Sequence, residues 1–225
     1  MVWDAHEGGI DGEALASRTE SLKASPPMFE SRLLDFFSRV HPAVPAVIFL
    51  PIILGTAIWG LAKVSIGMSV ALFAIGYFIW SLFEYWLHRL VFHFEPEEGI
   101  GARLHWMIHG IHHDHPNDPM RLVMPPAVSV PLAALVFVVL YFAAGEEYAP
   151  GLAAGFYAGY LAYDMLHYWL HHYVPSWPVG RALRERHMRH HFQDDTRGFG
   201  ISAPYWDEVF RTSPRSRRAE RAQHD

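Results

Sequence analysis

Long stretches without Asp, Glu, Lys or Arg divide the chain. Residues 40–62, 64–83 and 122–145 contain none of these four residue types. In a helix that rises 1.5 Å per residue, each stretch is long enough to cross a hydrocarbon core about 30 Å thick. A fourth stretch, 151–173, is apolar and aromatic but contains Asp164, His167 and His171. The pattern predicts four transmembrane helices in two hairpins, at about 45–62, 65–92, 126–144 and 151–173.

The remaining segments are shorter or more polar. Residues 1–27 are polar and end in Ser-Pro-Pro. Residues 28–40 place Phe29, Leu33, Phe36 or Phe37, and Val40 on one helical stripe, which fits either an interfacial helix on the membrane or a helix that caps the protein itself. The chain is thus expected to divide into a lead with an interfacial helix (1–40), a membrane domain (41–212) and a basic tail (213–225). A shallow, partly re-entrant hairpin is the alternative to four full crossings.

Basic residues predict the orientation. With four spans, Lys63 and the loop 145–150 lie on one side of the membrane, and every other Lys and Arg of the 18 lies on the opposite side. Because Lys and Arg concentrate in cytoplasmic loops, both termini are expected in the cytoplasm. The acidic N-terminal segment lacks the features of a signal peptide. The expected fold is an all-α integral membrane protein with a cytoplasmic helical cap.

Composition narrows the chemistry. The mean hydropathy of +0.07 would pass for a soluble protein, but it averages apolar spans with a polar cap. The chain has no cysteine, which excludes disulfides and thiolate metal sites. A net charge of −5 gives no reason to expect a nucleic acid partner. The 16 histidines are nearly as many as all Lys and Arg together, so a metal site would be built from imidazole and oxygen.

Ten of the histidines form a repeated pattern. Two pairs end the second and fourth predicted spans, and each pair is followed by an HxxHH triplet that spans one helix turn. All ten fall on the predicted cytoplasmic face, where they are enough for two metal ions with four or five nitrogens each. Polar groups at membrane depth are costly and by default functional. These histidines are His88, His93, His109, His112, His113, His167, His171, His187, His190 and His191.

The spacing of the first pair is unusual. His167 and His171 are four residues apart and share one helix face, but the five residues from His88 to His93 turn a straight helix by 140°. These two histidines therefore either serve two different metals or lie on a distorted helix.

Two carboxylates lie close to the histidines in the sequence. Glu84 precedes His88 by one turn, and Asp164 precedes His167 by three residues. Each is expected to accept the free ring N–H of a metal-binding histidine and so fix its tautomer. The alternative is a hydrogen bond between two spans.

At these residues the sequence resembles the fatty acid hydroxylase/sterol desaturase superfamily of membrane di-metal oxygenases, and within it the fatty acid 2-hydroxylases. The resemblance covers about 84–212 and is carried by HRLVFH, LHWMIHGIHH, Asp118, RLVMPP, YDMLHYWLHH, HMRHHF, GFGIS and Trp206-Asp207. It implies that all ten histidines bind metal, with His105, like Asp118, in a supporting role. It implies two iron ions, with zinc possible in purified samples, and O2-dependent hydroxylation of a fatty acyl chain, at the 2-position.

Several roles follow from that resemblance. Arg121 is a candidate contact for a lipid headgroup, with a membrane-surface charge as the alternative. Tyr168, Gly198 and Gly200 are further candidates near the substrate, and the GFGIS segment is either a lid or a plain turn. Eukaryotic members often carry a cytochrome b5-like domain, for which the first 40 or so residues are too short. We therefore expect a separate electron donor, cytochrome b5-like or ferredoxin-like.

Other functions are compatible with the same histidines but involve a different reaction or none. A desaturase or sterol oxidase of the same superfamily would remove hydrogen or act on a ring. A zinc-dependent membrane hydrolase would need no O2, since zinc has no redox chemistry. A transporter would place its ligands at mid-membrane, and a purely structural metal cluster would have no activity.

Overall fold

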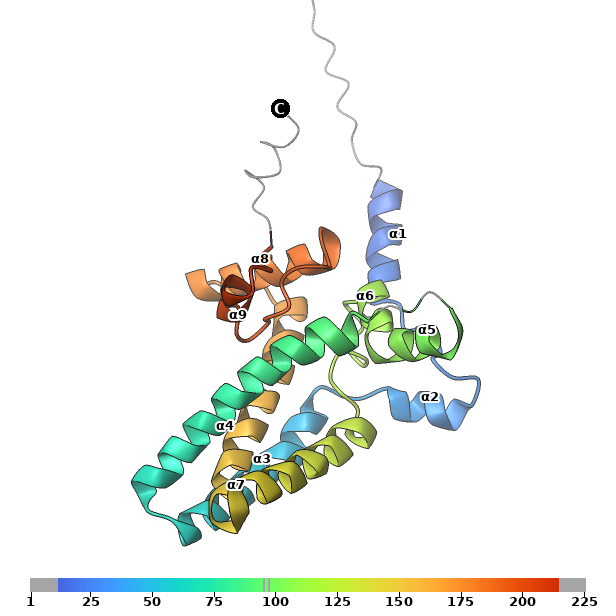
Figure 1. Ribbon diagram of the computed structural model, residues 1–225. Coiled ribbons are helices and arrows are strands. Elements are labelled where there is room, and N and C mark those ends of the chain that lie inside the picture. The colour runs from blue at the N-terminus through green and yellow to red at the C-terminus, as the bar shows by residue number, and fades with distance from the viewer. Residues whose placement is uncertain (1–11, 95, 97, 215–225) are drawn as a thin grey trace, which may run out of the picture.

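Helices make up all the regular structure of the described residues, which are 12–94, 96 and 98–214 of the computed structural model (Figure 1). The expected all-helical class is confirmed for this part of the chain. In chain order the helices are α1 (Gly12–Lys23), α2 (Arg32–Ser38), α3 (Ala43–Lys63), α4 (Ile66–Leu87), the π-helix η1 (His88–Phe92), α5 (Gly99–His105), the π-helix η2 (Trp106–Gly110), α6 (Ile111–Asp114), α7 (Pro126–His172), α8 (Pro178–Phe192) and α9 (Tyr205–Val209).

Three helical segments are long and apolar enough to cross a membrane: α3, α4 with η1 (Ile66–Phe92), and α7. The 47 residues of α7 are broken at Gly145, whose φ of 81° and ψ of 169° are not helical. Glycine adopts a positive φ without a steric cost, so the chain can reverse there. The two arms, 126–144 and 146–172, meet at the lower end of Figure 1 and separate toward the other end.

Small residues allow α4 and the second arm of α7 to approach closely. A methyl group at Gly76 would overlap the carbonyl of Leu152, and one at Gly155 would overlap the carbonyl of Phe73. Backbone contact of this kind is typical of helix pairs in membranes, where packing rather than hydrophobic burial drives association. These glycines therefore set how close the two helices lie.

Aromatic side chains fill the space between the three long segments. Phe49 of α3 packs edge-on against Tyr160 of α7, with ring centroids 4.6 Å apart. Trp80 of α4 meets Phe156 of α7 at 5.2 Å. Phe49 and Trp80 are almost completely buried, so this aromatic cluster fixes the relative positions of α3, α4 and α7.

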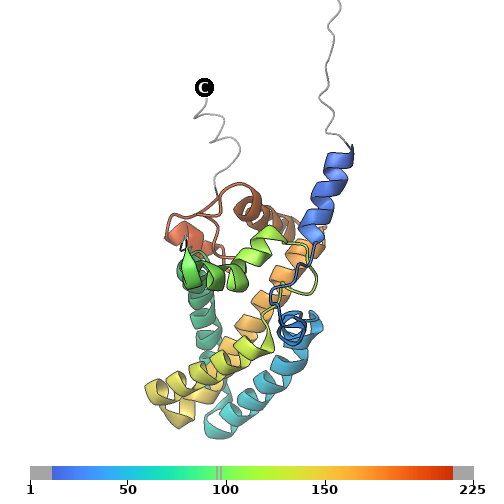
Figure 2. The same ribbon diagram turned by 90° about the vertical axis from the view of Figure 1, so that its right-hand side faces the viewer.

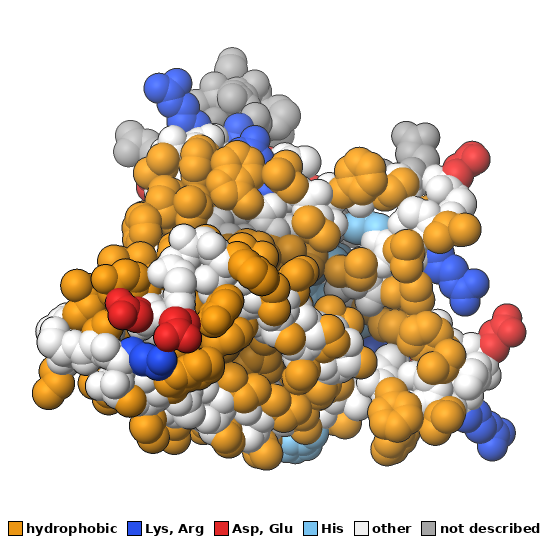
Figure 3. Space-filling model, turned by 60° about the horizontal axis from the view of Figure 1, so that its bottom comes forward, with side chains coloured by type: hydrophobic (Ala, Val, Ile, Leu, Met, Phe, Trp, Pro, Cys, Tyr) orange, Lys and Arg blue, Asp and Glu red, His pale blue; other side chains and the backbone are white. Residues whose placement is uncertain are grey.

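The outer surface of the long helices is apolar. In their most apolar windows, 17% of α3, 22% of Ile66–Phe92 and 6% of α7 is buried inside the protein, so most of these side chains face outward. Figure 3 shows hydrophobic side chains over most of the face it views, with one small group of charged residues within it and further charged residues along its edges. An exposed apolar surface of this extent fits hydrocarbon and not water.

The N-terminal lead is more structured than its sequence suggests. It contains α1, which has no apolar stripe and was not expected. The expected helix over 28–40 is present only as α2, whose first turn is capped by the Ser31 hydroxyl. Leu33, Phe36 and Phe37 of α2 are exposed. Residues 1–11 of the lead and 215–225 of the basic tail lie outside the described residues.

The shorter helices gather at one end of the long ones. Figures 1 and 2 show α5, α6, α8 and α9 beyond the ends of α4 and of the second arm of α7. The histidine pairs end those same two helices, so this end holds the site.

Candidate metal centre

All ten histidines of the repeated pattern come together in two groups. Within each group, one ring nitrogen from every member lies within 4.8 Å of those of the others. Metal group one contains His88, His93, His109, His113 and His190, and metal group two contains His112, His167, His171, His187 and His191. His105, His115 and His172 belong to neither group.

Each HxxHH triplet is divided between the groups. His109 and His113, four residues apart, face group one, while His112 faces group two. The C-terminal triplet on α8 is divided in the opposite sense, with two histidines in group two and His190 in group one. A residue three positions along a helix points away from the i, i+4 pair far enough to reach a second ion. The triplets therefore join the two groups into one centre.

The question of His88 and His93 is resolved by η1. These two residues are joined by an i+5 hydrogen bond from the His93 N–H to the His88 carbonyl, 3.1 Å long. This wider turn brings both imidazoles to one side, with their Nε2 atoms 3.3 Å apart. The helix is distorted and both histidines belong to group one.

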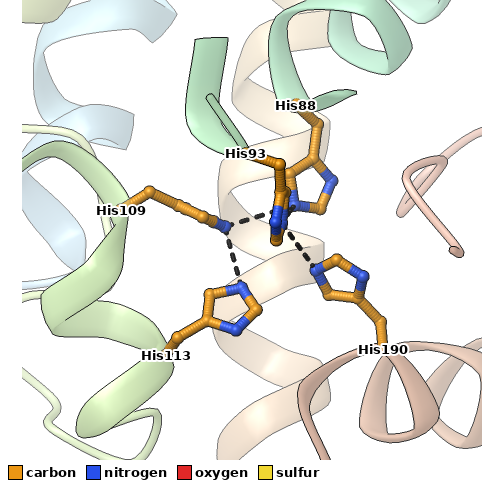
Figure 4. Close-up of side chains that lie close together, drawn as sticks. All are labelled: His88, His93, His109, His113 and His190. Atoms are coloured by element: carbon orange, nitrogen blue, oxygen red, sulfur yellow. Dashed lines mark hydrogen bonds between the residues drawn. The ribbon is translucent and has the colours of Figure 1, made fainter. Parts of the chain in front are cut away.

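Metal group one is drawn in Figure 4. The Nε2 atom of His88 lies 3.3 Å from that of His109. Nε2–Nε2 distances are 3.0 Å from His109 to His113 and 3.1 Å from His93 to His190. The five side chains come from α4–η1, the η2–α6 segment and α8, so regions far apart in the sequence meet at this point.

Metal group two has the same character. The Nε2 of His187 lies 2.7 Å from that of His171 and 3.2 Å from that of His191. The Nε2 of His112 lies 3.1 Å from that of His191. The ring of His191 also lies 4.2 Å from that of His113 in group one, centroid to centroid, so the groups are direct neighbours.

The donor arrangement fits a bound cation. The Nδ1 atoms of His88 and His190 each lie 2.8 Å from a backbone carbonyl, of Phe199 and Arg197 respectively, to which only an N–H can donate. Their Nε2 atoms therefore carry lone pairs, and both point toward Nε2 of His93, which can donate to only one of them. Two ligands at right angles and about 2.1 Å from an ion lie about 3 Å apart, close to these nitrogen spacings. Converging lone pairs at this spacing need a positive charge between them.

The imidazoles are held neutral, as metal binding requires. Burial, with help from neighbouring imidazoles, lowers the pKa of His93 and of His112 to about 3. The same causes hold the pKa of His109, His187 and His191 well below the ordinary value. These groups would bind a metal without first losing a proton near neutral pH.

The two carboxylates expected to support the histidines accept no hydrogen bond from an imidazole among the described residues, and hold the surrounding chain instead. Glu84 accepts hydrogen bonds from the backbone N–H groups of Ile201 and Ser202, and so contacts a loop that itself contacts His88. Asp164 accepts from the N–H of Met124, in the segment before α7, at 3.4 Å. It also accepts from the hydroxyl of Tyr160, within α7, at 3.3 Å.

The other expected supporting residues lie further out. Asp118 accepts from the Met120 N–H at 2.9 Å and lies 3.9 Å from Arg121. His105 ends α5, outside both metal groups.

An apolar cavity of about 520 Å³ opens beside both groups. Its wall contains His109 from group one and His112 and His167 from group two. Most of the remaining lining is aliphatic or aromatic, from α2, η1, η2 and the start of α7. Arg121 and Asp164 supply polar atoms to this wall. The cavity therefore places an apolar ligand against both metal groups at once.

The other candidate substrate residues lie elsewhere. Tyr168 packs against His172 with ring centroids 4.2 Å apart and is not part of the cavity wall. Gly198, with φ of +83°, and Gly200 lie in the loop after α8, also outside that wall. Asp207, which the sequence offered only as part of a motif, accepts two N–H groups of this loop and is fully buried.

Fold and site together define a class. The protein is a helical integral membrane protein in which two largely buried five-histidine groups, each able to hold a metal ion, face an apolar cavity. The sequence profile of the fatty acid hydroxylase family matches residues 73–212. The chain belongs to this family and is an enzyme of the hydroxylase class.

Known relatives agree over most of the chain. Dihydroceramide fatty acyl 2-hydroxylase FAH1 of Arabidopsis thaliana is 37% identical, over 99% of this chain and 94% of the relative. Ceramide very long chain fatty acid hydroxylase SCS7 of Saccharomyces cerevisiae is 40% identical, over 84% of this chain and 50% of the relative. A solved structure of scs7p, in which only the hydroxylase domain is visible, superimposes with a TM-score of 0.80 at 36% identity, covering 85% of this chain and 73% of that one.

Proposed function

We propose that this enzyme uses O2 to hydroxylate the 2-position of a fatty acyl chain, in a lipid of the N-acyl sphingoid class. The observation that carries the proposal is the cavity of about 520 Å³ with histidines of both metal groups in its wall. The relatives named for dihydroceramide and ceramide hydroxylation support this substrate class.

The two metal groups would each hold one iron ion through their five histidines. Iron, when bound, supplies the redox chemistry that activates O2 and oxidises an unactivated C–H bond. Imidazole is a suitable ligand for iron, zinc and copper alike, and the usual affinity order favours zinc over ferrous iron. Zinc is therefore expected to occupy the sites in protein purified without added iron.

The cavity wall would orient the acyl chain and exclude water. Its lining includes the apolar side chains of Leu87, Val91, Phe92, Val123 and Leu132. A dry site of this kind prevents side reactions of activated oxygen.

The polar end of the lipid is assigned to Arg121. Its side chain is 2% exposed and its guanidinium donates to Asp35 at 2.7 Å, yet the Nε and NH1 atoms have no hydrogen-bond partner among the described residues. With Asp35 and Asp118 nearby, the local charge is not positive, so a neutral carbonyl or hydroxyl suits this site better than a phosphate.

The reaction also needs a source of electrons. Hydroxylation converts R–H, O2, two electrons and two protons into R–OH and water. The protein side chains described here hold no redox-active group for those electrons, so we assign their supply to a one-electron carrier of the cytochrome b5 or ferredoxin type at the cytoplasmic face.

The membrane arrangement would contain four crossings: α3, α4 with η1, and the two arms of α7. Lys63 and Glu146 form an ion pair at 3.3 Å, which supports a common end for the two hairpin turns. The metal groups lie at the opposite ends of α4 and α7, where almost all Lys and Arg occur, and the positive-inside rule puts this end in the cytoplasm. The membrane domain would then be residues 41–212, preceded by the lead 1–40, whose α2 lies at the interface, and followed by the basic tail 213–225.

The experiment uses full-length protein in lipid nanodiscs with ferrous iron, a reducing system, an N-acyl sphinganine and 18O2. A product heavier by one oxygen, with the label in the acyl chain at the 2-position, is expected. The His112→Ala variant should give none. A product lighter by two hydrogens would identify a desaturase, and turnover without O2 would identify a hydrolase, and either result would overturn the proposal.

A further inference from the structure

The loop of residues 197–202, which we call the carbonyl loop, contacts metal group one through its backbone. The carbonyl of Phe199 accepts from Nδ1 of His88, and the carbonyl of Arg197 accepts from Nδ1 of His190, each at 2.8 Å. These bonds turn Nε2 of both imidazoles toward the group. The orientation of two of the five histidines therefore depends on where the carbonyl loop lies.

Two buried carboxylates, one from α4 and one from α9, hold this loop. Glu84 of α4 is 2% exposed, and its Oε1 accepts the N–H groups of Ile201 at 2.8 Å and Ser202 at 2.7 Å. Asp207 of α9 is fully buried and accepts the N–H groups of Phe199 at 2.9 Å and Gly200 at 3.1 Å. Four successive backbone N–H groups, 199–202, thus donate to two carboxylates.

This arrangement replaces regular secondary structure. The carbonyl loop is neither helix nor strand, so its conformation has no ladder of backbone hydrogen bonds to support it. A carboxyl oxygen can accept more than one hydrogen bond, so one such side chain holds two backbone N–H groups at once. The side chain of Ser202 adds a further bond to Oε2 of Glu84. The carboxylates, together with the bond from the Gly198 N–H to the Thr212 carbonyl, are therefore the polar restraints on the position of the Phe199 carbonyl.

The restraint reaches only one of the two groups. In group two, the Nδ1 atoms of His171, His187 and His191 are buried and have no hydrogen-bond partner among the described residues. No residue of the carbonyl loop contributes a carbonyl to that group in the described hydrogen bonds.

We propose that Glu84 and Asp207 are positioning residues for metal group one, acting through the carbonyl loop on the tautomer and orientation of His88 and His190. The proposal rests on the proposed metal ligation and adds that the two groups differ in how their ligands are held. Outer hydrogen bonds of this type are commonly worth 10–100-fold in metal affinity. Weakening the loop should therefore loosen the metal of group one and leave that of group two unchanged.

The experiment isolates each group in full-length protein. The His171→Ala/His187→Ala background leaves group one intact, and the His88→Ala/His109→Ala background leaves group two intact. Each is loaded with Zn²⁺ alone, and metal release to a chromophoric chelator is followed with and without Glu84→Gln. The control is Ser81→Ala, which removes hydrogen bonds from Tyr205 and Trp206 to α4 one turn earlier and does not touch the carbonyl loop.

Glu84→Gln should speed zinc release from group one about 10–100-fold and leave the release rate of group two unchanged within error. Ser81→Ala should change neither rate. Asp207→Asn should have the same effect, and this variant is measured instead if Glu84→Gln fails to fold. Equal acceleration in both groups, or no acceleration in group one, would overturn the proposal. The readout needs neither lipid nor O2, so its failure is distinct from a failure of the proposed hydroxylation.

Discussion

Adjacent histidines in this protein belong to different metal groups. His112 and His113 are neighbours in sequence, yet the first faces group two and the second faces group one. His190 and His191 are divided in the same way. Because successive side chains on a helix point about 100° apart, one short segment can reach two ions. Each triplet thereby couples the positions of the two groups.

This division predicts opposite effects for neighbouring substitutions. His190→Ala should weaken metal binding in group one and His191→Ala in group two, each with loss of about one tightly bound metal per protein after dialysis against a chelator. Combining His190→Ala with His113→Ala should add little further loss, since both lie in one group, whereas combining it with His112→Ala should remove both metals. His172→Ala, which lies outside both groups, is the control. Equal behaviour of the two double variants would contradict the division.

Buried neutral imidazoles also predict how stability depends on pH. In the unfolded chain histidine titrates at about 6.5, whereas burial lowers the pKa of His93 and His112 to about 3 in the folded protein. Below pH 6.5 the unfolded state therefore binds more protons than the folded state, so the free energy of unfolding falls as pH falls and is constant above that range.

For each histidine of this kind, the free energy of unfolding falls by about 1.4 kcal/mol per pH unit below pH 6.5. The midpoint of thermal unfolding of metal-free protein in detergent, measured from pH 7.5 to 5, should decline below 6.5. A variant with Gln at positions 93 and 112 should decline less steeply. A midpoint that stays constant in the wild type would contradict this.

At the scale of the helices, the sequence predicted the features that leave a local apolar pattern and did not predict those that depend on long-range contacts. Charge-free stretches mark where α3, α4 and the first arm of α7 run, and an apolar and aromatic stretch marks the second arm, because an apolar surface leaves a one-dimensional signal. Helix α1 left no such signal. The distorted helix η1 was only one of two alternatives for the spacing of His88 and His93. The contact of Glu84 with the carbonyl loop spans 117 residues, and no spacing rule reaches that far. The same limit applies to the assignment of histidines to groups, which depends on how distant helices pack.

Close packing of α4 on α7 predicts a large effect for a small substitution. Gly155→Ala would drive a methyl group into the carbonyl of Phe73, so the helices must separate at a cost of about 1–3 kcal/mol. Gly55→Ala on α3 has open space around it and should be neutral or slightly stabilising, because alanine favours helix more than glycine. Thermal stability in detergent, followed by size-exclusion chromatography, compares the two. Equal stability would mean that the close approach is not a constraint.

On the scale of the whole molecule, charge and apolar surface are separated along the long helices. The hairpin turns carry Lys63 and Glu146 at one end, and the histidine groups with their cap of short helices occupy the other. The apolar sides between them face outward. In the proposed topology this separation would place the cavity and both metal groups near one membrane surface, where a lipid chain from that leaflet and the proposed electron carrier would reach the same centre.

The proposed topology can be tested with cysteines, since the chain has none of its own. Glu147→Cys lies beside the Gly145 turn and Arg181→Cys on α8, and both positions are exposed. If both hairpins cross the membrane, a maleimide that cannot enter cells should label position 147 in intact cells and position 181 only after permeabilisation. Labelling of 181 alone in intact cells would reverse the orientation. If both positions react only after permeabilisation, the second hairpin is re-entrant, and its turn must then lie within reach of the cytoplasm.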